Sequence, residues 1–294
     1  MLSMNLIFFK LLFLNNNYES FKIPELKNLW DYRKNTNTIR KKWAKKVKSN
    51  LNIKESETVF YPFSGGDILF PIDIFPEFKV LVLVGLEPAG KRFSLDAKEG
   101  LIVNLKNLLN NGFLITRDME KFHKSGILTL ILTQLAEIGA SNISYKSFNK
   151  EVEISFIMNE KRRKIIYRQA NLSDENYENW INFLNRFPQF SLLIKSASFV
   201  LQQKGFSKIE REVLKRSDLI FQDNTGVSFK SLNKNGYKSF LFGDYKRSHG
   251  HKSFHPYFQP ALKKAYEEIN PPLLPFYAGY SAWRVPSNFL WAVR

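Results

Sequence analysis

The sequence predicts an α/β fold, with a Rossmann-like, mostly parallel sheet that carries helices on both faces. The run KVLVLVGL at 79–86 is almost wholly apolar, which is typical of a strand buried on both sides in a parallel sheet. Strand-like and helix-like segments alternate along most of the chain, as in βαβ units. The 294 residues are 44% hydrophobic, which is enough to bury the core of one large domain or two small ones.

Periodicity and helix-ending residues define the elements of the first half. Ile39, Trp43, Val47 and Leu51 recur every four residues, which predicts an amphipathic helix. Gly139 follows a second, more buried helical run and ends it. The predicted elements are a helix at 25–52, strands at 58–63 and 79–86, and helices at 101–110 and 126–138.

The pattern then changes to a period of two. Apolar and polar residues alternate over 151–156, and Asn149-Lys150 and Asn159-Glu160 are turn candidates. This pattern predicts an antiparallel β-meander at about 142–168, inserted between the α/β units.

The second half returns to alternating strands and helices. Ser173 is expected to begin a helix that Pro188 stops, and Ser207 with Glu210 forms a capping box for the next helix. The predicted strands lie at 190–195, 218–221, 237–242 and 288–293.

A boundary is predicted after residue 56. Residues 1–56 combine an apolar segment with a basic amphipathic helix, and residues 57–294 form a single Rossmann-like domain. The apolar start is a weak, atypical export signal and is too short to span a membrane. Both a cytoplasmic and an envelope-associated location agree with it.

The chain is strongly basic, with a formal net charge of +17, which favours anionic partners. Residues 31–50 hold eight basic residues and one acidic residue, so this helix carries much of the excess. A solvated helix packed through Trp43 is one interpretation, and an anionic surface or polymer bound to the helix is the other. The residues of that second interpretation are Arg40, Lys41, Lys42, Lys45 and Lys46. The sequence contains no secure nucleic-acid motif.

The segment 59–90 places a small polar loop after one strand and an acid after the next. Ser64, Gly65 and Gly66 supply the loop, and Glu87 follows Gly65 by 22 residues, an interval that suits a turn, a helix and a strand. In doubly wound sheets a ligand lies beyond the carboxyl ends of the strands, where such an acid accepts hydrogen bonds from a ribose. These four residues are therefore predicted to bind a nucleotide-type cofactor, and capping of a turn before Pro88 is the alternative role of Glu87.

Further polar candidates are Asp67, in the same loop as Ser64, and residues at two other strand ends. Asp67 is a candidate general base or a helix N-cap, and Lys195 is a candidate partner of a phosphate or carboxylate or a solvated strand end. The turn QDNTG contributes Gln222, Asp223 and Thr225 as pocket candidates, with Asp223 a second catalytic candidate.

Other reaction classes find little support. The absence of cysteine excludes disulfides, thiolate metal sites and cysteine nucleophiles. His249, His251 and His255 lie close together, but their spacing fits no standard metal motif and the neighbouring side chains are cationic. A surface loop is predicted there, and no metal is assigned.

Over residues 58–90, and more loosely over 190–226, the chain resembles class I S-adenosylmethionine-dependent methyltransferases. The resemblance implies S-adenosylmethionine as cofactor, with Glu87 as the ribose-binding acid. The chain has SGGD where that family has a fuller GxGxG, and three prolines where that family has an uninterrupted helix. The implied pocket is therefore methyltransferase-like, in an intact or a degenerate form.

Over most of its length the chain is also similar to a bacterial protein family without an assigned activity. The shared motifs are YPFSGxD, GLEPxG and QDxTG, at 61–67, 85–90 and 222–226. Some members of that family look exported. The alternative function is therefore a non-catalytic protein of the cell envelope or surface that binds an anionic partner through its basic helix.

Overall fold

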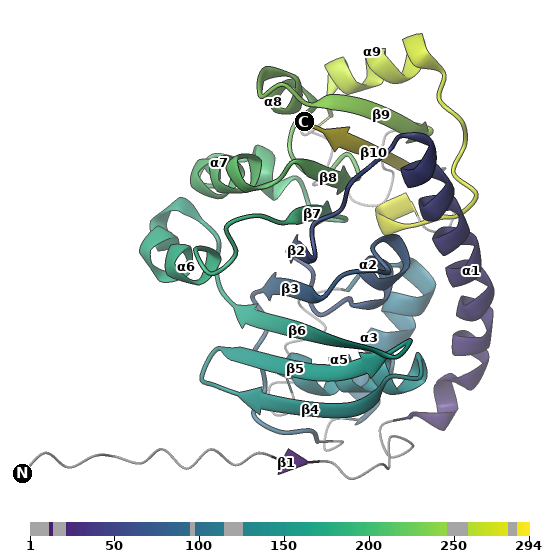
Figure 1. The fold of residues 1–294 in the computed structure, drawn as a ribbon, viewed down its shortest axis with the longest axis vertical. Helices are drawn as coiled ribbons and strands as arrows, with labels where there is room; N and C mark the ends of the chain where they lie inside the picture. The colour runs from purple at the N-terminus through teal and green to yellow at the C-terminus, as the bar shows by residue number, and fades with distance from the viewer. Residues whose placement is uncertain (1–11, 14–21, 95–97, 115–125, 246–257, 282–286) are drawn as a thin grey trace, which may run out of the picture.

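The computed structural model describes residues 12–13, 22–94, 98–114, 126–245, 258–281 and 287–294. Within these residues, one ten-stranded mixed sheet runs through the molecule and helices cover both faces (Figure 1). The strands are β1 (Leu12–Phe13), β2 (Thr58–Pro62), β3 (Val80–Gly85), β4 (Ser141–Ser147), β5 (Glu151–Met158), β6 (Lys161–Gln169), β7 (Ser191–Ile194), β8 (Leu219–Gln222), β9 (Lys238–Gly243) and β10 (Asn288–Val293). The helices are α1 (Lys27–Asn50), α2 (Leu69–Ile74), α3 (Lys98–Asn111), α5 (Gly126–Glu137), α6 (Tyr177–Leu184), α7 (Ser207–Arg216), α8 (Phe229–Lys234) and α9 (Pro260–Ile269), with short 3-10 turns η2 (Pro24–Leu26), η4 (Asp174–Asn176), η5 (Val200–Gln202) and η7 (Gly279–Ser281).

The strand order is β1-β4-β5-β6-β3-β2-β7-β8-β10-β9. The central strands β6, β3, β2, β7 and β8 are parallel, and the strands on either side pair antiparallel. The chain proceeds from β2 to β3, continues to β4 and comes back through β5 to β6, which lies beside β3. It then crosses to the other side of β2 to form β7 and β8. The order of the strands therefore reverses between β2 and β7.

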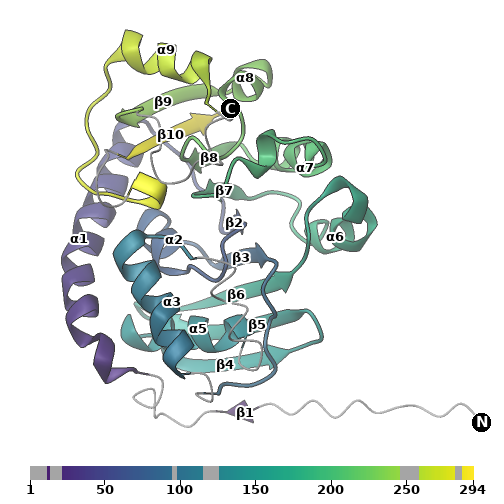
Figure 2. The ribbon, with the colours of Figure 1, turned by 180° about the vertical axis from the view of Figure 1, so that it is seen from behind.

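The parallel strands are apolar on both sides because each side faces a helix layer. Leu81 and Leu83 of β3 join one core, and Val82 and Val84 join the other. The first core is covered by α1, α2, α3 and α5, and the second by α6, α7, α8 and α9 (Figures 1 and 2). The α/β class predicted from the sequence is confirmed.

Helix α1 belongs to the first core, because Leu26 of η2 together with Trp30, Ala44 and Val47 of α1 are buried in the same cluster as the sheet. Its buried face differs from the one predicted. Ile39 is 43% exposed, whereas Arg40 is buried against Asp73 of α2. The prediction that Arg40 belongs to a cationic outer face is wrong, because an ion pair with a residue of α2 turns this side chain inward.

The predicted meander forms as β4, β5 and β6, with tight turns at Asn149-Lys150 and Asn159-Glu160. It is not a separate insertion. Strand β6 also pairs parallel with β3 along six residues, from Lys164 to Gln169, so the meander extends the central sheet.

The predicted capping box at Ser207 is replaced by a cap from a distant residue. Asp174 accepts the backbone N–H groups of Ser207 and Lys208 at 3.2 and 2.7 Å. In the part of the chain that the structure describes, no helix has the length and apolar character needed to cross a membrane. The apolar start apart from 12–13, and His249, His251 and His255, lie outside the described residues.

Candidate functional site

The carboxyl ends of β2, β3 and β7 meet at one edge of the sheet, since these neighbours are parallel. The loops that follow them enclose a small pocket of about 30 Å³. Its lining includes Ser64, Gly65, Asp67, Glu87 and Lys195, which were all singled out in the sequence. It is completed by Tyr61, Phe63, Phe113, Leu114 and Ser196.

The loop after β2 has an unusual backbone. Phe63, Gly65 and Gly66 have φ angles of 60°, 56° and 87°, in the left-handed region that costs a residue with a Cβ free energy. Gly66 does not line the pocket, and an added Cβ there would lie 2.9 Å from Ile127 of α5. Gln134, also on α5, fixes the loop because its Nε2 donates to the Gly66 carbonyl at 2.9 Å.

Gln134 was not identified from the sequence, although it is the one amide side chain in a mainly apolar, buried helix. Its Oε1 accepts the N–H of Ile68 at 3.3 Å, so one side chain holds both sides of Asp67. Its position in a mainly apolar segment is the feature of the sequence that could have identified Gln134.

Asp67 has the helix-capping role that the sequence offered as one alternative, and it also pairs with Lys195. Its Oδ1 accepts the N–H groups of Leu69 and Phe70 at 3.1 and 3.2 Å, which caps the first turn of α2. Its Oδ2 accepts from Lys195 at 2.8 Å and from the Tyr61 hydroxyl at 3.5 Å. Burial raises the pKa of Asp67, but the ion pair with Lys195, the charge of Arg33 and the N–H of Phe70 together hold the pKa below its usual value. Asp67 is therefore a poor proton acceptor.

Lys195 is 2% exposed, so the alternative of a solvated strand end is wrong. Its ammonium donates to Asp67 and to the carbonyl of Gly112, and lies 4.8 Å from the centre of the Phe70 ring. Burial lowers the pKa of Lys195, against the opposing effect of Asp67. Lys195 thereby joins the loops that follow β2 and β7 to the end of α3.

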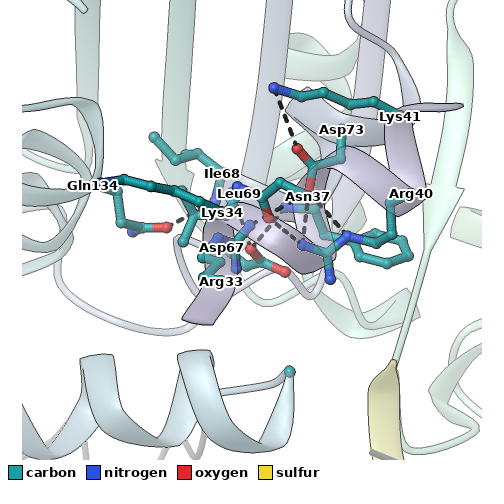
Figure 3. Close-up of polar contacts among 12 residues, drawn as sticks. Arg33, Lys34, Asn37, Arg40, Lys41, Asp67, Ile68, Leu69, Asp73 and Gln134 are labelled. Atoms are coloured by element: carbon teal, nitrogen blue, oxygen red, sulfur yellow. Dashed lines mark hydrogen bonds and ion pairs between the residues drawn. The ribbon is translucent and has the colours of Figure 1, made fainter. Parts of the chain in front are cut away.

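Helix α1 places two further cations near Asp67 and Asp73, as Figure 3 shows, although neither of them lines the pocket. Arg40 contacts Asp73 Oδ2 through Nε at 2.9 Å and through Nη2 at 2.6 Å. Arg33 lies 3.6 Å from the same oxygen, and its Nε and Nη2 make no hydrogen bond to the residues that the structure describes. Burial and the charge of Arg40 lower the pKa of Arg33 to about 9, while Asp73 and Asp67 oppose that effect. Arg33 was not identified as a site residue from the sequence.

Glu87 is folded back over the end of β3. The Tyr167 hydroxyl donates to the Glu87 carbonyl at 2.7 Å and contacts its carboxylate at 3.3 Å. A side chain at Gly85 would collide with the Glu87 carboxylate and with Tyr167, which explains the glycine of GLEP.

Glu87 also borders a second cavity, of about 20 Å³, between β3, α3 and α5. Its walls are mainly apolar and are formed by Pro88, Leu101, Ile127 and Leu130, with Asn104 and Gly126. Glu87 thus lies between a polar pocket and an apolar cavity.

The QDxTG turn lies behind the pocket and does not line it. The side chain of Gln222 bonds both backbone groups of Val227, at 2.7 and 2.9 Å, which is a structural role. Asp223 accepts the N–H of Ser196 at 2.8 Å, and Thr225 Oγ1 accepts that of Ala197 at 2.7 Å. These contacts hold Ser196 at a φ of 56°, beside Lys195.

Two segments distant in sequence form the roof of the pocket. The Phe113 ring contacts the Tyr280 ring edge-on, with centroids 4.9 Å apart. The Tyr280 hydroxyl bonds the Ser196 carbonyl at 2.8 Å and the Ser198 hydroxyl at 2.6 Å. No sequence pattern links residues 113 and 280, so this roof was not predicted.

The arrangement supplies binding groups more readily than a catalytic pair. Asp67 is paired with Lys195, and Asp223, whose pKa burial raises, is bonded to backbone and to Thr225. Within the described ranges, no three His, Asp or Glu side chains are grouped to hold a metal ion. No family model matches the chain, and no curated protein matches it.

Proposed function

We propose that this edge of the sheet binds a nucleotide-type ligand in the manner of a methyltransferase, with S-adenosylmethionine or S-adenosylhomocysteine as the ligand. The position of Glu87 between a polar pocket and an apolar cavity carries the proposal. In this arrangement Glu87 accepts the ribose hydroxyls, the apolar cavity takes the base and the polar pocket takes the tail of the ligand.

The strand order supports the same proposal. When β2, β3, β6, β7, β8, β9 and β10 are numbered one to seven along the chain, they lie in the order 3-2-1-4-5-7-6, with the seventh antiparallel. With β1, β4 and β5 left out of this numbering, the part 3-2-1-4-5 agrees with the Rossmann order 3-2-1-4-5-6. Ligands of such sheets lie where the order reverses, here between β2 and β7.

The two cavities, of about 20 and 30 Å³, are far smaller than the roughly 300–1,000 Å³ of usual ligand sites. Binding of a nucleoside therefore requires the Phe113–Tyr280 roof to move. The left-handed backbone of Phe63 and Ser196, on opposite sides of the pocket, agrees with a functional site, because strained residues concentrate there.

Titration calorimetry with S-adenosylmethionine and S-adenosylhomocysteine tests the proposal. Glu87→Gln is expected to weaken binding about 10- to 100-fold, because a hydrogen bond to a charged group contributes about 1.5–3 kcal/mol. Glu175→Gln, at an exposed glutamate of η4, is the matched control and should bind like the wild type. Absence of heat from the wild type at millimolar ligand would overturn the proposal.

A second function, binding of an anionic lipid surface by a non-catalytic protein, is favoured by a separate observation. Lys42, Lys45 and Lys46 are exposed on α1 and make no ion pair within the described residues. They are what remains of the predicted cationic face, since Arg40 is buried and Lys41 lies 3.7 Å from Asp73.

Cosedimentation with vesicles of anionic lipid, repeated over a salt series, tests this second function. We expect wild-type binding to weaken as salt rises, because exposed charges are screened within about 10 Å at 0.1 M salt. Charge reversal to Glu at Lys42, Lys45 and Lys46 should abolish binding. The same change at Lys204, Lys215 and Lys234, exposed near or on α7 and α8, should weaken it far less. Equal loss from both triple variants would indicate net charge and not the α1 surface.

A further inference from the structure

An extended, proline-rich segment follows α9 and carries apolar side chains on its outer side. Residues 270–277, here called the strap, contain three prolines. Seven large apolar side chains are exposed in the described part of the chain, and three of them lie in or next to the strap, at Ile269, Leu273 and Tyr277. Their exposed fractions are 58%, 72% and 61%. Single exposed apolar residues are ordinary, but a group of them is typical of a surface that contacts a protein or a membrane.

The strap is held in place by contacts along its inner side. The N–H of Gly243 in β9 donates to the Pro272 carbonyl at 2.8 Å. The Ser287 hydroxyl bonds both backbone groups of Ala278, at 2.8 and 3.1 Å, and Phe276 is buried in the first core. The proline rings also fix φ. The outer side chains are therefore presented on an ordered backbone, so binding them requires little further loss of conformational entropy.

The strap lies beside the C-terminal half of α1 (Figures 1 and 2). The Phe276 ring contacts the Trp43 ring edge-on, with centroids 5.3 Å apart. Ile39 and Lys46 lie one turn before and one turn after Trp43, so they share its side of the helix, and both are exposed. Lys42, next to Trp43, is exposed as well. Apolar and cationic side chains are therefore neighbours on one surface of the molecule.

This combination of side chains fits an anionic lipid bilayer. Proteins that bind at a bilayer surface bury apolar side chains in the interfacial region while lysines attract anionic headgroups, and tyrosine is enriched at that depth. A single weak anchor gives marginal binding, and a second signal makes it stable. The acids of α9 next to the strap, Glu267 and Glu268, are paired with Lys263 and Lys264 at 2.5 and 3.5 Å, so they add no net negative charge.

We infer that the strap inserts Leu273 and Tyr277 into the interfacial region of an anionic bilayer while Lys42 and Lys46 contact the headgroup phosphates. The inference rests on the second proposed function, because α1 supplies the charge. It adds the element that enters the bilayer. It also gives the bound protein an orientation, with the edge of the sheet at β9 nearer the bilayer than β4.

Cosedimentation with anionic vesicles measures the contribution of the strap. Leu273→Ser combined with Tyr277→Ser is expected to weaken binding about tenfold or more, because two apolar side chains are no longer removed from water. The salt dependence should remain, because every charge is kept. Leu86→Ser combined with Phe148→Ser removes two exposed apolar side chains from the other half of the sheet and is the matched control. Both double variants should melt at the wild-type temperature, and equal weakening of binding by both would overturn the inference.

A fluorescent label tests directly whether the strap enters the bilayer. The chain has no cysteine, so Leu273→Cys provides a single labelling position for an environment-sensitive dye. On anionic vesicles the emission of this label is expected to shift to the blue and to be quenched by a nitroxide near the headgroup end of the lipid acyl chain. Phe148→Cys, labelled in the same way, is the control and should show neither change.

The outcomes separate this inference from the function on which it rests. If the wild type binds anionic vesicles but the label at Leu273→Cys shows neither a blue shift nor quenching, the strap stays in water. That result overturns the inference and leaves binding through α1 intact. If the wild type does not bind the vesicles, both are overturned. A concentration-dependent dimer that Leu273→Ser combined with Tyr277→Ser converts to a monomer would mean that a second copy covers the strap, which also overturns the inference.

Discussion

Arg33 and Arg40 lie seven residues apart on α1 and are buried alike, at 7% and 6% exposure, yet their surroundings differ. Arg40 makes two hydrogen bonds to Asp73 and one to Asn37. The Nη2 atom of Arg33 lies 3.6 Å from Asp73 Oδ2, which already accepts hydrogen bonds from Arg40. Removing Arg33 leaves no carboxylate without a cation, because Asp67 keeps Lys195 and Asp73 keeps Arg40.

The two arginines should therefore respond oppositely to substitution by methionine. Arg40→Met is expected to lower the free energy of unfolding by about 3–5 kcal/mol, as when one partner of a buried ion pair is removed. Arg33→Met is expected to leave stability unchanged or to raise it. Urea unfolding at pH 7 measures both, and destabilisation of similar size in the two variants would contradict the expectation.

The pH dependence of the Arg33→Met comparison has a definite sign. The folded pKa of Arg33, about 9, lies below its unfolded value, so the native state releases this proton first as pH rises. The wild type should thus gain stability relative to the variant above pH 9, and the difference should be constant below that pH. A difference that widened in the opposite direction above pH 9 would contradict the assignment of this pKa.

For single residues, the sequence predicted which polar side chains follow the strands. It did not predict which distant residues hold them in place. Ser64, Gly65 and Glu87 follow predicted strands, so their meeting at one edge followed from parallel pairing. Gln134 and Tyr280 reach the site from segments whose own patterns contain no reference to it. Whether any of them binds ligand stays a prediction.

Among the elements, helices with strong periodicity were predicted well, and the way they pack was not. The helix at 25–52 is present as η2 and α1, but its buried face contains two arginines. Periodicity detects which apolar side chains share one face of a helix. It cannot detect that Arg40 is buried, because the carboxylate that pairs with Arg40, Asp73, lies on another helix. The α7 cap fails for the same reason, since its acceptor is Asp174, 33 residues before Ser207.

For the whole molecule, alternation of strands and helices indicated the α/β class, whereas pairing across the sheet depends on distant residues. The meander was read correctly as antiparallel, but β6 also pairs with β3, so that Ile166 lies beside Val82. No local pattern in 161–169 distinguishes a free edge from a strand with two neighbours. The reversal of strand order between β2 and β7 is likewise a property of the assembled sheet.

The boundary between β2 and β7, where the strand order reverses, is called the seam. Strand β2 pairs with β3 at five positions, from Thr58 to Pro62, but with β7 only at Val59 and Phe60. Helix α1 runs along both halves of the sheet (Figures 1 and 2), and its Trp43 contacts aromatic rings of β8 and β9, beyond β7. The partners of Trp43 are Phe221 of β8, Phe242 of β9 and Phe276.

Trp43→Ala should therefore lower the local stability of the half of the sheet that contains β8, β9 and β10 more than that of the other half. Its cost is expected to fall below the roughly 3–5 kcal/mol of a fully buried Trp→Ala change, because Trp43 is half-buried. Hydrogen exchange followed by mass spectrometry should show faster exchange in β8, β9 and β10, with β4 and β5 little changed. Trp180→Ala, in the core on the opposite face, is the control and should affect α6 and its neighbours. Uniform acceleration across all strands in Trp43→Ala would mean that the two halves unfold as one unit and that α1 does not join them.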